Sequence, residues 1–205
     1  MSTEEQNNTG VNLQRRKILT GATGVVGAAG ATFLAVPFVS SWQPSEKARA
    51  AGAPVNADIS QLQPGQLMTV AWRGKPVWVV RRTPDMIKTL PTLDGNLRDP
   101  GSEKSEQPDY CKNPTRSVRE EFLVVVGVCT HLGCAPLFRP AVGSPDVGAD
   151  WMGGFFCPCH GSKFDLAGRV LQSVPAPINL EIPAYHFLSD NVIRIGEDPK
   201  QEGVV

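Results

Sequence analysis

The chain has little net charge, few aromatic side chains and few histidines. Its 205 residues carry 20 Lys and Arg against 20 Asp and Glu, three His, and only 7% aromatic residues. A protein that binds nucleic acid needs a basic excess to displace counterions, and a charge-expanded disordered chain needs an excess of one sign. The balance argues against both classes, and we expect no nucleic-acid partner.

Gly and Pro, by contrast, are abundant. The 20 Gly and 18 Pro exceed the roughly 12% of average usage, so turns and short strands should dominate over long packed helices. We predict a mainly β domain over 55–205, with one short helix at 84–90 and a surface insertion at 91–118. Strands are predicted at 66–72, 76–81, 122–128, 154–156, 179–183, 185–188 and 192–195.

An appendage precedes this domain. Arg15 and Arg16 stand ahead of a stretch, 18–45, that has no charged side chain. The apolar part of that stretch, 18–39, would extend about 33 Å as a helix, which is enough for a bilayer core of about 30 Å. The paired arginines in front of it resemble a twin-arginine export signal.

We therefore predict that 1–17 is a cytoplasmic N-terminus, that 18–43 is a single transmembrane anchor, and that 44–54, which is polar and rich in small residues, is a flexible linker or hinge. A cleaved signal peptide is one alternative, because Ala48-Arg49-Ala50 has the form of a cleavage site. The apolar stretch is nevertheless longer than the 7 to 15 residues typical of such a peptide. The buried helix of a soluble protein is the other alternative.

Four of the five Cys and two of the three His fall within 129–160. They form two blocks, CTHLGC at 129–134 and CPCHGS at 157–162. Thiolates and imidazoles together suit zinc or iron, whereas magnesium and calcium prefer oxygen ligands. The two blocks therefore indicate a metal site.

Familiar uses of such residues fail by count or spacing. A structural zinc ion takes four ligands, which leaves two of the six candidates unexplained. Covalent haem needs C-x-x-C-H and a thioredoxin-like dithiol needs C-x-x-C, whereas the second block has C-x-C-H. An arrangement that uses every candidate joins the C-x-H of the first block to the C-x-x-H of the second and leaves one further Cys in each block.

Both blocks resemble those of the Rieske iron-sulfur subunits of bacterial quinol:cytochrome c oxidoreductases, the cytochrome bc complexes or respiratory complex III. The order of anchor, linker and domain is similar over nearly the whole chain. The resemblance implies a Rieske-type antiparallel β domain with a small cluster-binding subdomain at about 127–178. It also implies one [2Fe-2S] cluster, in which two His ligands raise the potential above that of an all-Cys cluster.

The same resemblance assigns roles to individual residues. The implied cluster ligands are Cys129, His131, Cys157 and His160, and the implied disulfide joins Cys134 to Cys159. Of the two exposed imidazoles, His160 would meet the quinol hydroxyl and take its proton. Ser162 would donate its hydroxyl to a cluster sulfur. An apolar docking tip and a proline loop over the cluster would comprise Leu132, Gly133, Pro158, Pro175 and Pro177.

The chain departs from the family pattern at two positions. Phe164 stands where many mitochondrial members have Tyr, so one hydrogen bond to the sulfur of the first Cys ligand should be missing and the reduction potential should be lower. Val174 stands in the proline loop where Gly is often found.

The resemblance thus implies an electron-transfer subunit of a multisubunit enzyme, a quinol:cytochrome c reductase. Its expected partners are quinol, cytochrome b and a c-type cytochrome, within a dimeric complex of the bacterial inner membrane and with the β domain in the periplasm. The Rieske subunit of arsenite oxidase is the alternative. A soluble oxygenase ferredoxin would lack counterparts of Cys134 and Cys159, and a structural zinc module is the nonredox rival. We interpret Cys111, His186 and the Arg81-Arg82 pair as surface residues.

Overall fold

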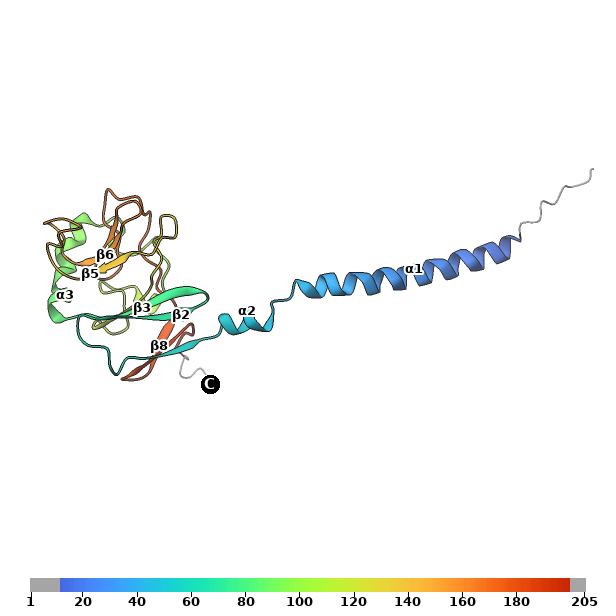
Figure 1. Cartoon of the computed structure of the whole chain (residues 1–205), viewed down its shortest axis with the longest axis horizontal. Helices are drawn as coiled ribbons and strands as arrows, with labels where there is room; N and C mark the ends of the chain where they lie inside the picture. Colours follow the sequence, from blue (N-terminus) through green and yellow to red (C-terminus); the bar gives the residue numbers. More distant parts are fainter. Residues whose placement is uncertain (1–11, 200–205) are drawn as a thin grey trace, which may run out of the picture. The chain divides into compact units, whose positions relative to one another are not determined.

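The computed structural model describes residues 12–199. Two compact units divide the chain between Arg49 and Ala50. The first contains a single long helix, and the second contains the β-strands (Figure 1). Part of the predicted cytoplasmic segment, residues 1–11, lies outside the described residues.

Helix α1 covers Leu13–Ser41. Asn12 caps its start, because the Asn12 side-chain oxygen accepts hydrogen bonds from the backbone N–H groups of Gln14 and Arg15 at 3.1 and 3.0 Å. These are two of the donors that the first turn of a helix leaves without partners. The helix is long and apolar enough to cross a membrane, and none of its side chains is buried. The expected apolar helix is present, but it begins ahead of the two arginines.

A short helix, α2, covers Glu46–Ala51. It lies inside the segment 44–54 that was predicted as a flexible linker. Arg49 and Glu46 form an ion pair at 3.4 Å on its surface. Isolated helices of this length are marginal in water, so the helical turn is compatible with a linker that bends.

The second unit contains three antiparallel sheets of three strands each. Their strand orders are β1-β9-β8, β2-β3-β4 and β5-β6-β7. In Figure 1 the β5-β6 sheet lies at the end of the unit away from β8. The strands cover Val55–Asp58 (β1), Leu67–Trp72 (β2), Lys75–Arg81 (β3), Phe122–Val126 (β4), Leu137–Arg139 (β5), Gly154–Cys157 (β6), Ser162–Phe164 (β7), Tyr185–Ser189 (β8) and Val192–Ile195 (β9). The predicted mainly β class is confirmed.

The core centres on β3 and β4. All five residues of β4 are buried, as are four consecutive residues of β3. Such continuous apolar runs mark strands that are covered on both faces. Trp78 of β3 stacks on Phe155 of β6, with ring centroids 5.3 Å apart. This contact fastens the small third sheet, which carries the Cys and His blocks, to the central sheet.

Helix α3 covers Pro84–Thr89, within one residue of the prediction. Thr83 caps it by accepting a hydrogen bond from the N–H of Met86 at 3.2 Å. Two short 3-10 helices, η1 over Pro91–Asn96 and η2 over Asp109–Cys111, follow in the segment predicted as an insertion.

The predicted strand at 179–183 is wrong. Its backbone binds three separate segments: Leu180 N donates to Gly168 O, Ile182 N donates to Glu106 O, and Glu181 O accepts from Val126 N. Because the backbone hydrogen bonds of this run go to three different segments, the run does not pair with any one of them as a strand. The short strands β1, β5 and β7 were not predicted.

The insertion at 91–118 is not a surface segment throughout. Cys111 and Arg116 are both fully buried. The Arg116 guanidinium donates to the carbonyl oxygens of Leu180, Ala167 and Gly168 at 2.8 to 3.3 Å. A buried guanidinium needs such acceptors, and here they come from loops distant in sequence. The interpretation of Cys111 as a surface thiol is therefore wrong.

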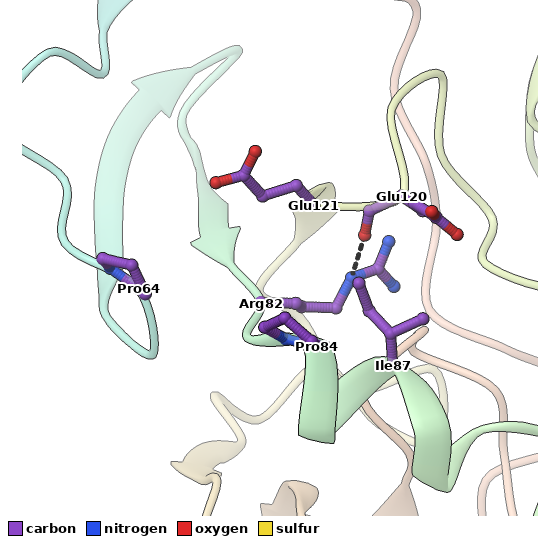
Figure 2. Close-up of a pocket in the computed structure, with 6 residues that line it drawn as sticks. All are labelled: Pro64, Arg82, Pro84, Ile87, Glu120 and Glu121. Atoms are coloured by element: carbon purple, nitrogen blue, oxygen red, sulfur yellow. Dashed lines mark hydrogen bonds between the residues drawn. The ribbon is translucent and has the colours of Figure 1, made fainter.

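Arg82 was also misinterpreted as a solvated residue. It is 1% exposed and donates to the carbonyl oxygens of Glu120 and Thr115 at 2.8 and 2.9 Å. Figure 2 shows its guanidinium beside Glu120, and Arg82 lines a surface pocket together with Pro84 and Ile87. Burial lowers the pKa of Arg82 to about 10, so it is still charged at neutral pH.

Candidate metal centre

Two loops at one edge of the third sheet carry the Cys and His blocks. The first leads from β4 to β5 and is closed on itself, because Cys129 N donates to Cys134 O at 2.7 Å and Gly133 N donates to Cys129 O at 3.0 Å. The second joins β6 to β7, where Cys157 and Ser162 are paired across the ladder. Each loop turns with a glycine in the left-handed region, Gly133 at φ 82° and Gly161 at φ 77°, a conformation that a residue with a Cβ adopts only at a cost.

A disulfide between Cys134 and Cys159 joins the two loops, with Cα atoms 6.7 Å apart. This is the pairing that the family resemblance implied. It links the end of one block to the centre of the other, so the four remaining Cys and His side chains are held by one covalently closed unit.

Those four side chains occupy one site, with the sulfurs inside and the imidazoles toward the surface. Cys129 and Cys157 are each 2% exposed and carry free thiols. His131 is half-buried and His160 is exposed. The two rings lie 4.8 Å apart between centroids. The predicted ligand set thus consists of a buried pair of thiols and an outer pair of imidazoles, and its assignment as cluster ligands stays a prediction.

The Nδ1 atom of His131 is buried without a hydrogen-bond partner. Among the described residues only one other buried side-chain nitrogen or oxygen, Trp72 Nε1, shares this condition. A buried polar atom without a partner costs free energy, and a metal ion would satisfy it. The donor set around it, two thiols and two imidazoles, fits a Rieske [2Fe-2S] cluster.

The Cys157 thiol keeps its proton until a metal displaces it. Burial, together with the neighbouring Cys129 thiol, raises the pKa of Cys157. Metal ligation requires thiolates and therefore releases these protons. The Cys157 sulfur also lies within 4.8 Å of the sulfurs of Cys134 and Cys159, but disulfide sulfurs are not available as thiolate ligands.

A third segment, the proline loop over 173–178, lies against both blocks. Ser162, which is fully buried, accepts a hydrogen bond from Ala176 N at 3.1 Å through its Oγ. Thr130 Oγ1 donates to Ile178 O at 2.7 Å. The hydroxyl proton of Ser162 is not used in accepting this bond, so the predicted donation to a cluster sulfur is compatible with it.

The departure at Val174 has a structural explanation. The left-handed residue of this loop is Ser173, at φ 59°, and Val174 has no positive φ. The backbone conformation at position 174 therefore does not require glycine.

The predicted docking tip is exposed. The Leu132 side chain is 71% exposed, and the other four members of the tip and proline loop, Gly133, Pro158, Pro175 and Pro177, are exposed as well. Together with His160 they place apolar surface beside an exposed imidazole. Phe164, by contrast, is fully buried in β7 opposite Phe155.

Sequence reasoning missed two residues that support the site. Thr130 lies inside the first block, but its hydroxyl carried no distinguishing signal because threonine is common in loops. Arg98 donates from Nη2 to Val174 O at 2.8 Å, and no short-range pattern connects positions that far apart. His186, on β8, lies outside the site as expected, and its Nδ1 is 3.1 Å from Glu197 O.

Comparisons with known proteins identify the family of the chain. The family profile described as the Rieske [2Fe-2S] domain matches residues 53–185, which is more than half of the chain. The profile described as the ubiquitinol-cytochrome C reductase Fe-S subunit TAT signal matches residues 5–45.

Individual relatives cover nearly the full length. The ubiquinol-cytochrome c reductase iron-sulfur subunit of Allochromatium vinosum is 61% identical over 189 residues, 92% of this chain and 91% of the relative. The subunit of the same name from Blastochloris viridis is 44% identical over 89% of this chain and 92% of the relative. A chain of a hyperthermophilic respiratory Complex III is similar in structure, with a TM-score of 0.46, 30% identity and coverage of 86% of this chain and 98% of that one. On the domain match and the full-length identities, the chain belongs to the Rieske iron-sulfur family, among the iron-sulfur subunits of the ubiquinol-cytochrome c reductases.

Proposed function

We propose that this chain is the electron-transfer subunit of a quinol:cytochrome c oxidoreductase and holds its cluster through Cys129, Cys157, His131 and His160. The observation that carries the proposal is the buried, unpartnered Nδ1 of His131 beside two buried thiols. When bound, a [2Fe-2S] cluster supplies a centre that accepts and returns one electron. The other parts of the reaction fall to the side chains around it.

The exposed imidazole of His160 is suited to meet the substrate. Its outward nitrogen can hydrogen-bond a quinol hydroxyl and accept the proton that leaves the quinol on oxidation. His131 is more buried, so His160 is the better candidate for this contact. The nearby disulfide restricts both loops, which keeps the imidazole at a fixed place on the surface.

The apolar tip around Leu132 suits docking on a partner. An exposed leucine beside exposed prolines can enter an apolar pocket on cytochrome b, where quinol is held, and the same surface can then meet a c-type cytochrome. Recognition through apolar contact agrees with a chain that has no net charge. Membership of the family supports these partners and a dimeric complex as part of the proposal.

The N-terminal segment supports a proposal for the position of the chain in the cell. We place α1 across the bacterial inner membrane and the β domain in the periplasm, on the strength of the apolar helix and the match to a twin-arginine signal. The segment 44–54 would be the hinge that lets the domain visit two sites. Its short helix α2 offers a few backbone hydrogen bonds that a bend could break.

Electron paramagnetic resonance of the purified full chain tests the ligand set. Ascorbate reduction of the wild type should give the signal of a His-ligated, high-potential cluster, with two iron and two sulfide bound. His131→Gln and His160→Gln should each abolish that signal. His186→Gln is the matched control and should retain it. A wild-type protein that binds zinc in place of iron, or that is silent after reduction, would overturn the proposal.

A further inference from the structure

Among the hydrogen bonds of the described chain, three fasten the proline loop to its surroundings. Two involve the Cys and His blocks: Thr130 Oγ1 donates to Ile178 O, and Ala176 N donates to Ser162 Oγ. The third comes from Arg98, whose Nη2 donates to Val174 O at 2.8 Å. Arg98 belongs to neither block and lies in the segment that the sequence predicted as a surface insertion.

The backbone that carries Arg98 is held firmly beside the start of the loop. Arg98 N donates to Val170 O at 3.0 Å. Its neighbour Leu97 forms an isolated antiparallel bridge with Leu171, and Leu97 O accepts from Gln172 Nε2 at 3.0 Å. The backbone of Arg98 is therefore held in place. The hydrogen bond from its guanidinium to Val174 O consequently restrains the loop relative to the rest of the domain.

The loop has few means of holding its own shape. Pro175 and Pro177 have no N–H to donate, and Ser173 adopts a left-handed conformation, φ 59°, that is costly for a residue with a Cβ. Only Pro175, with its fixed φ, separates Val174 from Ala176. A displacement of Val174 is consequently passed to the Ala176 N–H, which is the group that holds Ser162 Oγ.

We propose that Arg98 is a positioning residue for the cluster site. By holding Val174 O it keeps the Ala176 N–H on Ser162 Oγ, and this bond fixes the direction in which the Ser162 hydroxyl proton points. The inference rests on the proposed ligand set, because a directed hydroxyl matters only beside a cluster sulfur. A hydroxyl donated to sulfur stabilises the reduced, more negative state, so Arg98 keeps the reduction potential high.

Hydrogen exchange tests the restraint without reference to activity. In peptides that span 173–178 only four amides can exchange, because two of the six residues are proline. Arg98→Ala should speed exchange of the Ala176 amide about tenfold, the factor expected from loss of a hydrogen bond to a charged donor. Arg98→Lys, which retains a charged donor, should recover part of the protection. Lys104→Ala removes an exposed positive charge from the same segment and should leave the exchange rate unchanged.

Redox titration of the loaded protein tests the consequence. Arg98→Ala should lower the midpoint potential, and the shift caused by Ser162→Ala should be smaller in the Arg98→Ala background than in the wild type, since coupled residues are not additive. If Arg98→Ala and Lys104→Ala shifted the midpoint potential equally and neither changed the exchange rate of the Ala176 amide, Arg98 would act only through its charge. The proposal would then be wrong. Additive shifts for Arg98 and Ser162 would also overturn it. Failure of the ligand set would appear separately, as a wild type without a cluster signal.

Discussion

The imidazole rings of His131 and His160 meet at 88°, with their centroids 4.8 Å apart. They come from two different loops, so nothing in the local backbone sets this relation. Edge-on rings can each turn one nitrogen toward a shared metal ion without the rings stacking on each other. The relative orientation of the two rings depends on how the two loops are held together. The Cys134–Cys159 disulfide is the covalent link between the loops.

Removal of the disulfide should weaken the site and the domain together. Cys134 and Cys159 are 25 residues apart, and cross-linking a loop of this size stabilises the folded state by about 3 to 4 kcal/mol in the chain-entropy model. We expect the double variant Cys134→Ser/Cys159→Ser to unfold at a lower urea midpoint and to hold less iron after purification. Urea titration followed by circular dichroism, with iron analysis, measures both.

Cys111→Ala is the matched control for that experiment. It removes a buried thiol that lies outside the two blocks and leaves the disulfide in place. Its iron content should equal that of the wild type. An unchanged urea midpoint and full iron content in the double variant would show that the loops hold their positions without the covalent link.

The chemistry of the site was accessible to sequence reasoning because it is carried by residues close together in the chain. The six Cys and His of 129–160, and a glycine at each loop turn, are recognisable as two short blocks. Their assignment as ligands and disulfide came from the resemblance, since spacing alone does not say which Cys pairs with which. The structure places Cys134 on Cys159 and leaves Cys129 and Cys157 free and buried.

Long-range contacts elsewhere in the domain could not be predicted in this way. Arg82 and Arg116 resemble surface residues in the sequence, yet each is buried against backbone carbonyls from distant loops. The segment 179–183 has the pattern of a strand, but its hydrogen bonds go to three partners. In both cases the outcome depends on long-range contacts, and local residue patterns contain no information on them.

Asp99 should make the stability of the domain depend on pH below about 4. Burial opposes ionisation of this carboxylate, but hydrogen bonds from Ser105, Glu103 and Lys104 outweigh it and lower its pKa. A depressed folded-state pKa stabilises the fold above the unfolded-state pKa of about 3.9, and that contribution is lost as the pH falls through the folded-state value. Asp99→Asn should therefore lower the free energy of unfolding at pH 7. Below pH 4 the free energy of unfolding of this variant should decrease less steeply with falling pH than that of the wild type.

Urea titrations between pH 2.5 and pH 7 measure this difference. Asp85→Asn is the comparison, because Asp85 is an exposed carboxylate paired with Lys88 at 2.9 Å and such pairs contribute little. It should change the curve less than Asp99→Asn does. Parallel curves for the Asp99 variant and the wild type would mean that the hydrogen bonds to Asp99 do not favour its charged form.

Leu132 should matter for docking and not for the cluster. Its side chain is 71% exposed at the tip, and loss of an apolar anchor at an interface costs about 2 kcal/mol, or about thirtyfold in affinity. Leu132→Asp should lower quinol:cytochrome c turnover by about that factor in the assembled complex. The isolated chain should keep its cluster, with the iron content and paramagnetic signal of the wild type.

Leu188→Asp provides the control for the leucine experiment. Leu188 is 50% exposed on β8, outside the two blocks, so the same substitution there should leave turnover intact. A loss of turnover that is equal in both variants would point to general damage at the surface, and full activity of Leu132→Asp would remove Leu132 from the docking surface.

Phe164→Tyr tests whether the chain lacks one hydrogen bond to its cluster. Phe164 is fully buried in the same apolar cluster as Cys129 and Cys157. A phenol hydroxyl added there without an acceptor would cost about 1 to 3 kcal/mol. If the Cys129 sulfur accepts it, that cost is offset and the reduced state is stabilised. We expect redox titration to show a higher midpoint potential, with little change in the urea midpoint.

The neighbouring Phe155 offers a matched comparison for this substitution. It is also fully buried and pairs with Phe164 across the β6-β7 ladder. Its ring contacts the rings of Trp78 and Phe138. Phe155→Tyr should therefore destabilise the domain without raising the potential. An unchanged potential in Phe164→Tyr, together with a loss of stability as large as in Phe155→Tyr, would show that no cluster sulfur lies within reach of position 164, and the lower potential expected of this chain would need another cause.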